Sequence, residues 1–253
     1  MRNAMAAEWV KLRSIRSTWF CLAAGVVVSA LGAVTLGGAA AMEGAPVQAT
    51  EPVVSVVLFS QYAALTLAVL AVTTEYASGT IRPTLQAVPV RGRMLAAKSL
   101  VVAPLLFAAG VLTGAVAALA TYLVLLAPVF PTVPVLEPAE TAADLLRLGV
   151  FHALIGVLAV GASAALRGSA GALAVLFMAT LGLPLLLVMT GSSVAVEVSL
   201  RLPTFAGMAF LESTDNLTGG ALPYPPGEGL AWLAAWTALA VAAGYAVLRR
   251  RDA

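Results

Sequence analysis

The stretch GRMLAAKS, residues 92–99, has the residue types and nearly the spacing of a phosphate-binding loop. Such a loop reads G-x-x-x-x-G-K-[ST], and its glycines allow backbone N–H groups to face the phosphates of a nucleotide. Ala97 stands where the second glycine is required, and alanine adopts positive φ only at a cost. The residues before Gly92 are interrupted by Pro89 instead of forming a strand, and an apolar run follows. We therefore expect no nucleotide-hydrolysing site in this segment.

Other residues that could do chemistry are few and scattered. His152, the only histidine, is expected near the outer end of an apolar helix, within reach of Asp144 or Arg147. It is either part of a proton relay or an interfacial polar residue, and the second interpretation is favoured. The single cysteine, Cys21, cannot form an internal disulfide, and the sequence has no H-E-x-x-H motif or cysteine pair for a metal. The sequence predicts neither a catalytic site nor a metal site, and so no enzyme.

The composition indicates an integral membrane protein. Of 253 residues, 61% are hydrophobic and 10% charged, and the mean hydropathy is +0.98, whereas a soluble domain has about 25% charged residues. The apolar runs are continuous, as in helices, and lack the alternation of lipid-facing strands. The predicted fold is an all-α polytopic membrane protein, a single transmembrane domain over 1–253 with six transmembrane helices and an N-terminal interfacial helix. The expected spans are about 19–41, 53–73, 95–127, 149–166, 170–190 and 230–248.

Basic residues are distributed unequally between the connections. The segments that would share the side of the N-terminus are 1–18, 74–94, 167–169 and 249–253. Together with Lys98, they hold all of the 14 basic residues except Arg147 and Arg201. Because basic residues favour the cytoplasmic side, both termini are expected in the cytoplasm, with 191–229 outside the cell. A cleaved signal peptide ending near Ala41 is the alternative, and the long basic segment before the apolar run disfavours it.

The expected spans carry no ionisable residue at mid-depth. A secondary carrier coupled to protons or sodium needs acidic or polar coupling sites there, so this class is the least expected. If the protein moves a substrate across the membrane, the energy must come from another subunit. A membrane anchor or scaffold subunit without a transport role is the second class that the sequence leaves open.

Residues 1–18 form a basic amphipathic segment. The large apolar residues that recur at helical spacing are Met5, Trp9, Leu12, Ile15 and Trp19. Lys11, Arg13 and Arg16 lie largely off that face, a pattern typical of a helix in the headgroup plane. The segment is either a plain topogenic signal or an elbow helix that leads into the first span and packs against the other helices.

The longest expected cytoplasmic connection, 74–94, predicts a short helix of its own. Gly79 can end the preceding helix, Thr80 can cap the new one, and Pro83 is tolerated in its first turn. The residues expected on one side of this helix are Ile81, Leu85 and Val88, and Pro89 would end it. A two-turn helix is marginal alone in water, so it should rest on the bundle or on another protein. An ordinary charged reversal between two spans is the alternative.

These features together resemble the membrane subunit, or permease, of type-2 ABC exporters of the actinobacterial type. The stretches that carry the resemblance are EWVKLRSIRSTWF at 8–20, TTEYASGTIRPTLQAVPVRGRMLAAK at 73–98, LPTFAGMAFL at 202–211 and LRRRDA at the C-terminus. They occur in the family's order, and with the six-span layout they cover essentially the whole chain. The second stretch is the most specific of the four.

The resemblance implies a coupling role for the connection 74–94, which in this family docks into a separate ATPase subunit. The residues that match the coupling region are Glu75, Tyr76, Gly79, Thr80, Ile81 and Arg82. The residues that match the elbow helix are Trp9, Lys11, Leu12, Arg13 and Arg16. We expect Glu75 and Arg82 to orient the docking through polar contacts.

The resemblance also implies the partners. They are two ATPase subunits, which bind the ATP and Mg²⁺, and a second permease copy or homologue in the lipid bilayer of the cell membrane. This chain would bind no cofactor and no nucleic acid. The sequence does not specify the transported substrate, and lipids, peptides and amphipathic drugs are all compatible with it.

Overall fold

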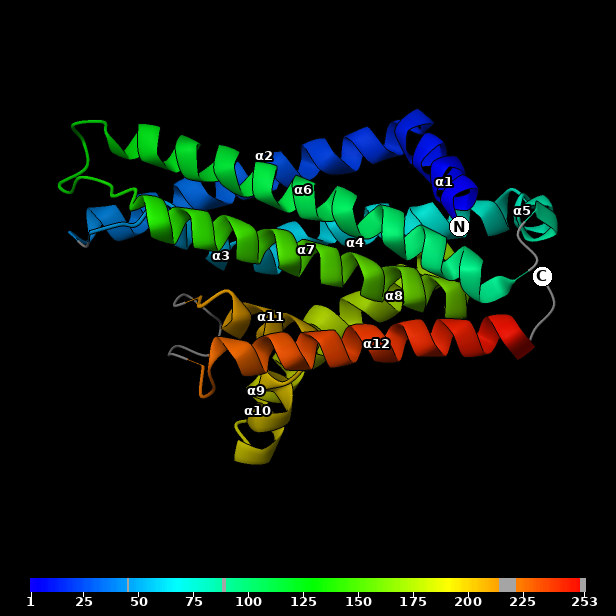
Figure 1. The fold of residues 1–253 in the computed structure, drawn as a ribbon. Helices are drawn as coiled ribbons and strands as arrows, with labels where there is room; N and C mark the ends of the chain where they lie inside the picture. The colour runs from blue at the N-terminus through cyan, green and yellow to red at the C-terminus, as the bar shows by residue number, and fades with distance from the viewer. Residues whose placement is uncertain (45, 88–89, 214–221, 251–253) are drawn as a thin grey trace.

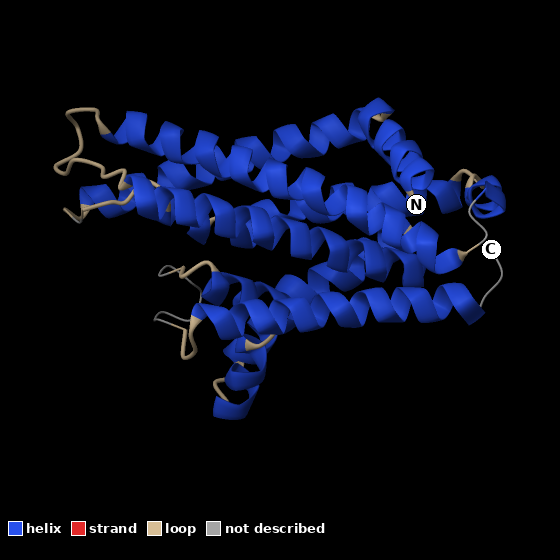
Figure 2. Cartoon of the chain, in the orientation of Figure 1, coloured by secondary structure: helices blue, strands red, loops and turns tan. Residues whose placement is uncertain are grey.

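The computed structural model describes residues 1–44, 46–87, 90–213 and 222–250, which are almost entirely helical (Figures 1 and 2). Within these ranges there is no β-strand, and one isolated backbone bridge joins Gln48 to Val135. The expected all-α fold is confirmed. The helices are α1 (Arg2–Ser14), α2 (Arg16–Met42), α3 (Glu51–Ser55), α4 (Val57–Ala77), α5 (Ile81–Ala87), α6 (Arg91–Leu125), α7 (Pro138–Leu166), α8 (Ser169–Phe177), a π-helical turn (Met178–Gly182), α9 (Leu183–Met189), α10 (Ser193–Leu200), α11 (Pro203–Phe210) and α12 (Pro226–Arg250).

Six helical segments of the described chain are long and apolar enough to cross a membrane: α2, α4, α6, α7, α8 through α9, and α12. Each overlaps one of the expected spans, so their number and helical nature are confirmed. The boundaries differ most at α7, which begins at Pro138 instead of near 149, because its charged first turns continue the helix beyond the apolar run. The helix α4 begins at Val57 instead of near 53, because Glu51–Ser55 forms the separate helix α3.

The long helices lie side by side, and α7 packs against α4, α6 and α12 (Figure 1). Phe151 and Ile155 of α7 are fully buried. Helices α7 and α12 approach each other closely at Gly161 and Gly244: a Cβ atom added to Gly161 would lie 2.5 Å from the backbone carbon of Ala240, and one added to Gly244 would meet the carbonyl oxygen of Gly161. Small residues at a helix crossing permit this backbone contact.

The fifth expected helix is bent. The π-helical turn and Pro184 follow α8, so α9 and α10 project from the side of the bundle as a pair of short antiparallel helices (Figure 1). Proline removes a backbone donor and a π-turn widens the helix, and both are common at kinks. Gly191, with φ of 67°, turns the chain between the two helices, and the Ser199 hydroxyl donates to the Pro184 carbonyl over 2.8 Å. The expectation of a plain helix over 170–190 is corrected to a bent one.

The segment 191–229, expected outside the cell, contains the helices α10 and α11 and the start of α12, and residues 214–221 lie outside the described residues. The second of these helices, α11, is buried on every side from Pro203 to Ala209 and packs mainly against α12. The stretch LPTFAGMAFL is therefore part of the core of the bundle.

One end of the bundle gathers α1, α5, the start of α6 and the C-terminal end of α12 (Figure 1). The helix expected in the connection 74–94 is present as α5, and Gly79 ends α4 with φ of 73°, as predicted. Val88 and Pro89, expected on its apolar side and at its end, lie outside the described residues, as do Arg251 and Asp252 at the C-terminus. We call this end of the molecule the terminal end.

Candidate functional site

The stretch that resembles a phosphate-binding loop is helical. Helix α6 runs without interruption from Arg91, so residues 92–99 form its first turns. Ala97 and Lys98 are each 1% exposed, inside the protein and not at a surface where phosphates could be cradled. Lys98 belongs instead to a buried cluster of charges.

The Lys98 ammonium group has three partners. It donates to Glu8 Oε2 over 2.8 Å, to Glu75 Oε1 over 2.7 Å and to the Ala71 carbonyl over 3.2 Å. An ammonium group has three protons and no acceptor. Every proton of Lys98 is therefore used inside the protein, and its charge faces two carboxylates.

Lys11 completes the arrangement. It donates to Glu75 Oε1 over 2.7 Å and to Glu8 Oε1 over 3.1 Å, and it lies 3.5 Å from the Thr84 hydroxyl. We call Glu8, Lys11, Glu75 and Lys98 the charge cluster. It contains two carboxylates and two ammonium groups, so it is neutral, and it connects α1, α4 and α6 and reaches α5 through Thr84.

Burial makes each member of the charge cluster depend on the others. The exposed fractions of the side chains are 1% for Lys98, 7% for Glu75, 9% for Glu8 and 39% for Lys11. Burying such charges costs free energy that their mutual attraction roughly offsets, whereas removing a single partner is strongly destabilising, by about 3–5 kcal/mol. The charge cluster therefore specifies how α1 sits on α4 and α6 more than it adds net stability.

The environment of Lys11 raises the pKa of its ammonium group above the ordinary value of 10.5. Partial burial is the largest single effect and opposes this shift, because it disfavours the charged form. The hydrogen bond to Glu75 and the negative charges of Glu8 and Glu75 together outweigh it. Lys11 therefore stays charged in the folded protein at neutral pH and well above.

The N-terminal helix buries only part of the predicted apolar face. Helix α1 ends at Ser14, and Ile15 is extended with φ of −87° and ψ of 124°, so residues 1–18 are not one continuous helix. The buried residues of α1 are Glu8 and Leu12, whereas Trp9 is 49% exposed. The prediction of one continuous face holding Met5, Trp9, Leu12, Ile15 and Trp19 is wrong, because the helix breaks at Ile15. Within α1, Leu12 and Met5 pack against the apolar core, and Glu8 lies on the same buried side.

An elbow between α1 and α2 is nevertheless present. The Trp19 indole donates to the Arg13 carbonyl over 3.1 Å and closes the bend at Ile15. Arg13, Arg16 and Trp19 are exposed around this bend. Basic and tryptophan side chains at such a bend suit the polar–apolar boundary of a bilayer.

The residues expected to couple this chain to a partner fall into two groups. Gly79, Thr80 and Arg82 are exposed at the start of α5, where another protein can touch them. The three that face inward are Glu75 and Ile81, which are buried, and Tyr76, whose ring lies 5.6 Å from the Arg167 guanidinium. We expected Glu75 to make a polar contact with a partner protein. This does not fit its position, because the side chain is buried and its Oε1 accepts hydrogen bonds from Lys11 and Lys98.

A cleft of about 300 Å³ separates α1, α5 and the start of α6. Glu8 and Lys11 lie along its wall on α1, Pro83 and Thr84 on α5, and Met94 on α6. The cleft therefore exposes the edge of the charge cluster beside the short helix.

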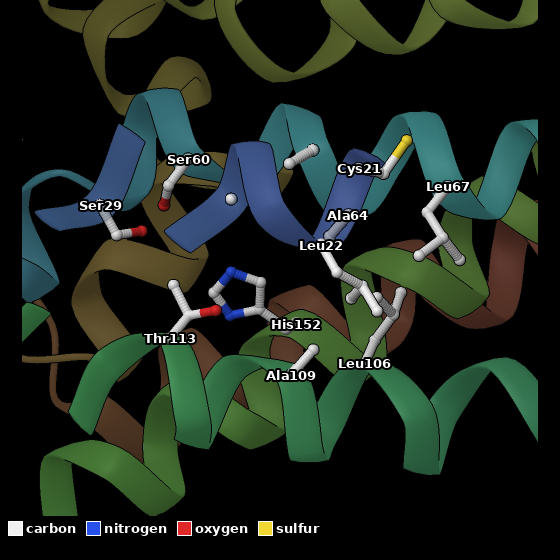
Figure 3. Close-up of a pocket in the computed structure, with 12 residues that line it drawn as sticks. Cys21, Leu22, Ser29, Ser60, Ala64, Leu67, Leu106, Ala109, Thr113 and His152 are labelled. Carbon is white, nitrogen blue, oxygen red and sulfur yellow. The ribbon is translucent and has the colours of Figure 1, made fainter. Parts of the chain in front are cut away.

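His152 is at the middle of the bundle, which corrects the prediction of an interfacial residue. It is 7% exposed, and its Nδ1 donates to the Leu148 carbonyl over 2.8 Å instead of reaching Asp144 or Arg147. Figure 3 shows its ring in a small cavity among the hydroxyl groups of Ser29, Ser60 and Thr113, which come from α2, α4 and α6. The cavity has room of about 20 Å³, enough for one water molecule.

The expectation that no ionisable residue lies deep inside the expected spans is therefore wrong for His152. Its helix begins before residue 149, so a residue expected near one end is in fact central. Lys98, which the sequence grouped with the cytoplasmic basic residues, is near the beginning of α6 and is buried in the charge cluster. The i, i+3 spacing of Glu8 and Lys11 hinted at an ion pair, but nothing local connected Glu8 to Lys98.

Comparison with known proteins adds no identification. No family model matches the sequence, and no curated protein matches it. The assignment of a function rests on the residues, their arrangement and the resemblance described above.

Proposed function

We propose that this chain is the membrane-spanning permease subunit of an ATP-driven exporter of the type-2 ABC class. It would form the translocation path in the cell membrane and be driven by a separate ATPase subunit that binds ATP and Mg²⁺. The observation that carries the proposal is α5, a short helix with an exposed start, which is inserted between two long apolar helices and is in contact with the charge cluster.

The apolar helices and the positions of the charges support placement in a membrane. Six segments of the described chain have the required length and hydropathy. Exposed arginines gather at the terminal end, among them Arg13, Arg16, Arg82, Arg93 and Arg249. Since basic residues favour the cytoplasm, this end is proposed to be cytoplasmic, with both termini and α5 on the side where ATP is available.

The charge cluster gives a physical route for coupling. A partner that moves α5 pulls on α4 through the turn Ser78–Thr80, and the contact of Thr84 with Lys11 connects α5 to the charge cluster. The charge cluster joins these helices to α1, so the three move as one unit and not separately. Alternating access then follows when this unit rocks against the rest of the assembly. In this proposal Glu75 transmits the movement, and Arg82 touches the partner.

The exposed helix faces leave room for a second permease subunit. In the most apolar stretch of α2, only 17% of the residues are buried inside the chain, and in that of α8 through α9 only 22% are buried. A second copy or a homologue, together with lipid, would cover these faces, as the resemblance implies. Neither the sequence nor the fold specifies the transported substrate.

The side of the membrane that α5 faces is tested with a cysteine scan. In a Cys21→Ser background, Arg82→Cys is labelled in intact cells with a membrane-impermeant maleimide, and then in inverted vesicles. We expect labelling in inverted vesicles only. Labelling of intact cells would overturn the proposed orientation, and with it the coupling role of α5.

The partner is tested with a photoreactive amino acid at position 82 in cells. We expect a crosslinked protein that hydrolyses ATP, and an Arg82→Glu variant that lowers the stimulation of this ATPase by the permease. Arg250→Glu, an exposed arginine on α12 outside α5, is the matched control and should leave the stimulation unchanged. If the intact complex contains no ATPase, the protein is an anchor or scaffold subunit instead.

A further inference from the structure

An apolar groove of about 680 Å³ runs between α6, α7 and α12 near the terminal end. Its walls include Leu95 and Leu100 of α6, Leu154 and Val157 of α7, and Ala238 and Val241 of α12. The Thr237 hydroxyl, which also lines the groove, donates a hydrogen bond to the backbone carbonyl of Leu233 over 2.8 Å. Ser99 also lines the groove, and its hydroxyl is buried with no hydrogen-bond partner among the described residues. The lining is otherwise mainly apolar, so the groove suits a hydrocarbon.

The end of the groove nearest the terminal end is bordered by an aromatic ring, with a positive charge beside it. The Tyr245 ring packs on Gly92, where an added Cβ would lie 3.0 Å from it. The Arg249 guanidinium lies 5.8 Å from the centre of the same ring, one helical turn farther along α12. Arg93 is exposed on the first turn of α6, beside Gly92. The apolar groove thus leads to a rim with basic side chains.

The length of the groove limits what it holds. Its lining on α12 extends from Ala234 to Tyr245, and at 1.5 Å per residue this is about 16 Å. The hydrocarbon core of a bilayer is about 30 Å thick, so the groove is as deep as one leaflet. A transmembrane helix of another protein would need a seat along both leaflets, whereas one acyl chain of a lipid needs only this depth.

We propose that this groove is a binding site for an anionic glycerophospholipid of the leaflet at the terminal end. One acyl chain lies between α6, α7 and α12, and the phosphate lies at the rim, where Arg249 and Arg93 are its counter-charges. Basic residues between helices at the cytoplasmic side of a membrane are suited to anionic headgroups. The acyl chains of all bilayer lipids are equally apolar, so the preference for an anionic lipid comes from its headgroup. The groove fixes where the acyl chain lies.

A bound lipid at this position would affect the helices that the proposed coupling moves. The groove is bounded by the first turns of α6, which carry Lys98 on another side, and by α12. An acyl chain seated there keeps α6 and α12 apart at their exposed edges. Arg91 ties them together nearby by donating to the Leu248 carbonyl. The inference requires the membrane placement of the proposed function, but it does not require the ATPase.

The test uses the full chain, purified in detergent and incubated with equal amounts of phosphatidylglycerol and phosphatidylcholine. Native mass spectrometry counts the lipids that stay bound. We expect the unaltered protein to retain phosphatidylglycerol preferentially, and Arg249→Gln to lower that preference about fivefold. Ala238→Trp fills the groove and should remove the bound lipid.

Each variant has a matched control on the same helix. Arg250→Gln removes a neighbouring exposed charge that lies off the groove, and Ala243→Trp adds the same ring to an exposed position that does not line it. Both should bind lipid as the unaltered protein does. Circular dichroism of all four variants checks that they remain folded.

A phosphatidylglycerol with a photoreactive group in its acyl chain gives the position. We expect adducts on Leu95, Leu100 or Val241. Adducts elsewhere, or equal lipid retention in Ala238→Trp and Ala243→Trp, would overturn the proposal. So would a dimer in the unaltered protein that Ala238→Trp separates into monomers, because the groove would then hold a second copy of the chain. No ATPase is present in these measurements, so their failure leaves the coupling proposal standing.

Discussion

Replacing Lys98 with alanine removes the most deeply buried charge of the charge cluster. Lys98 is 1% exposed and holds Glu8 and Glu75 at 2.8 Å and 2.7 Å. Without it, two buried carboxylates face the single ammonium group of Lys11. Breaking a buried ion pair by removing one partner costs about 3–5 kcal/mol. For a chain of this size, that loss corresponds to a fall in the thermal midpoint of about 6–20 °C.

The assay is thermal unfolding of the purified protein in one detergent, followed by the fluorescence of its four tryptophans. Arg93→Ala is the control, because Arg93 is exposed on the same helix and its removal should change the midpoint little. A second variant, Lys98→Met with Glu75→Gln, leaves Glu8 and Lys11 as a balanced pair. We expect it to recover most of the lost stability, because a buried ion pair contributes little net free energy compared with neutral side chains of similar size.

Two results would refute this reasoning. If Lys98→Ala unfolds at the same temperature as Arg93→Ala, the buried charges do not depend on one another. If the double variant is less stable than Lys98→Ala, the loss comes from packing of the lysine side chain and not from unpaired carboxylates.

Three further predictions concern α4, α12 and α1. Gly79→Ala should lower the thermal midpoint, because Gly79 has φ of 73° and a left-handed conformation costs other residues about 1–2 kcal/mol; an unchanged midpoint would mean that this turn rearranges freely. Gly244→Ala should cost about 1–3 kcal/mol, because its Cβ would meet the Gly161 carbonyl and force α7 from α12. Gly227→Ala, with open space around its Cβ, is the control for both and should be neutral in the same unfolding assay. Lys11 has a pKa raised above 10.5 in the folded protein, so its stabilising contribution is complete below that pH and is lost as the pH rises through the folded-state value. A pH series of thermal midpoints should show this alkaline loss in the unaltered protein and less of it in Lys11→Met, and equal losses would argue against the raised pKa.

Much of the fold was predictable because its signals are local. Each long helix corresponds to a continuous apolar run, and the length of such a run does not depend on distant residues. The turn at Gly79 and the short helix after it were also predictable, since glycine and threonine set the conformation of their own neighbours. The bend after α8 was less visible, because Pro184 and Gly182 are both apolar and do not interrupt the hydropathy signal.

The candidate site was predicted only in part. Exposed residues at the start of α5 lie where the sequence indicated, because the helix and its turn are local features. The contact with a partner protein that was expected of Glu75 does not fit its buried position. That position beside Lys98 depends on how α4 packs against α6. The continuous apolar face expected up to Trp19 was wrong because the helix breaks at Ile15. The buried side of α1 also carries Glu8, which meets a lysine from α6.

The amino-acid sequence alone determined that this protein is a set of apolar helices with a short polar helix between two of them, because hydropathy and turn chemistry act over a few residues. Only the tertiary structure decided which charges meet. Glu8 and Lys98 are 90 residues apart and form an ion pair of 2.8 Å, and the groove between α6 and α12 requires residues from three helices. Such contacts arise when helices pack, and packing depends on the shapes of all the faces together, which no single stretch of sequence carries.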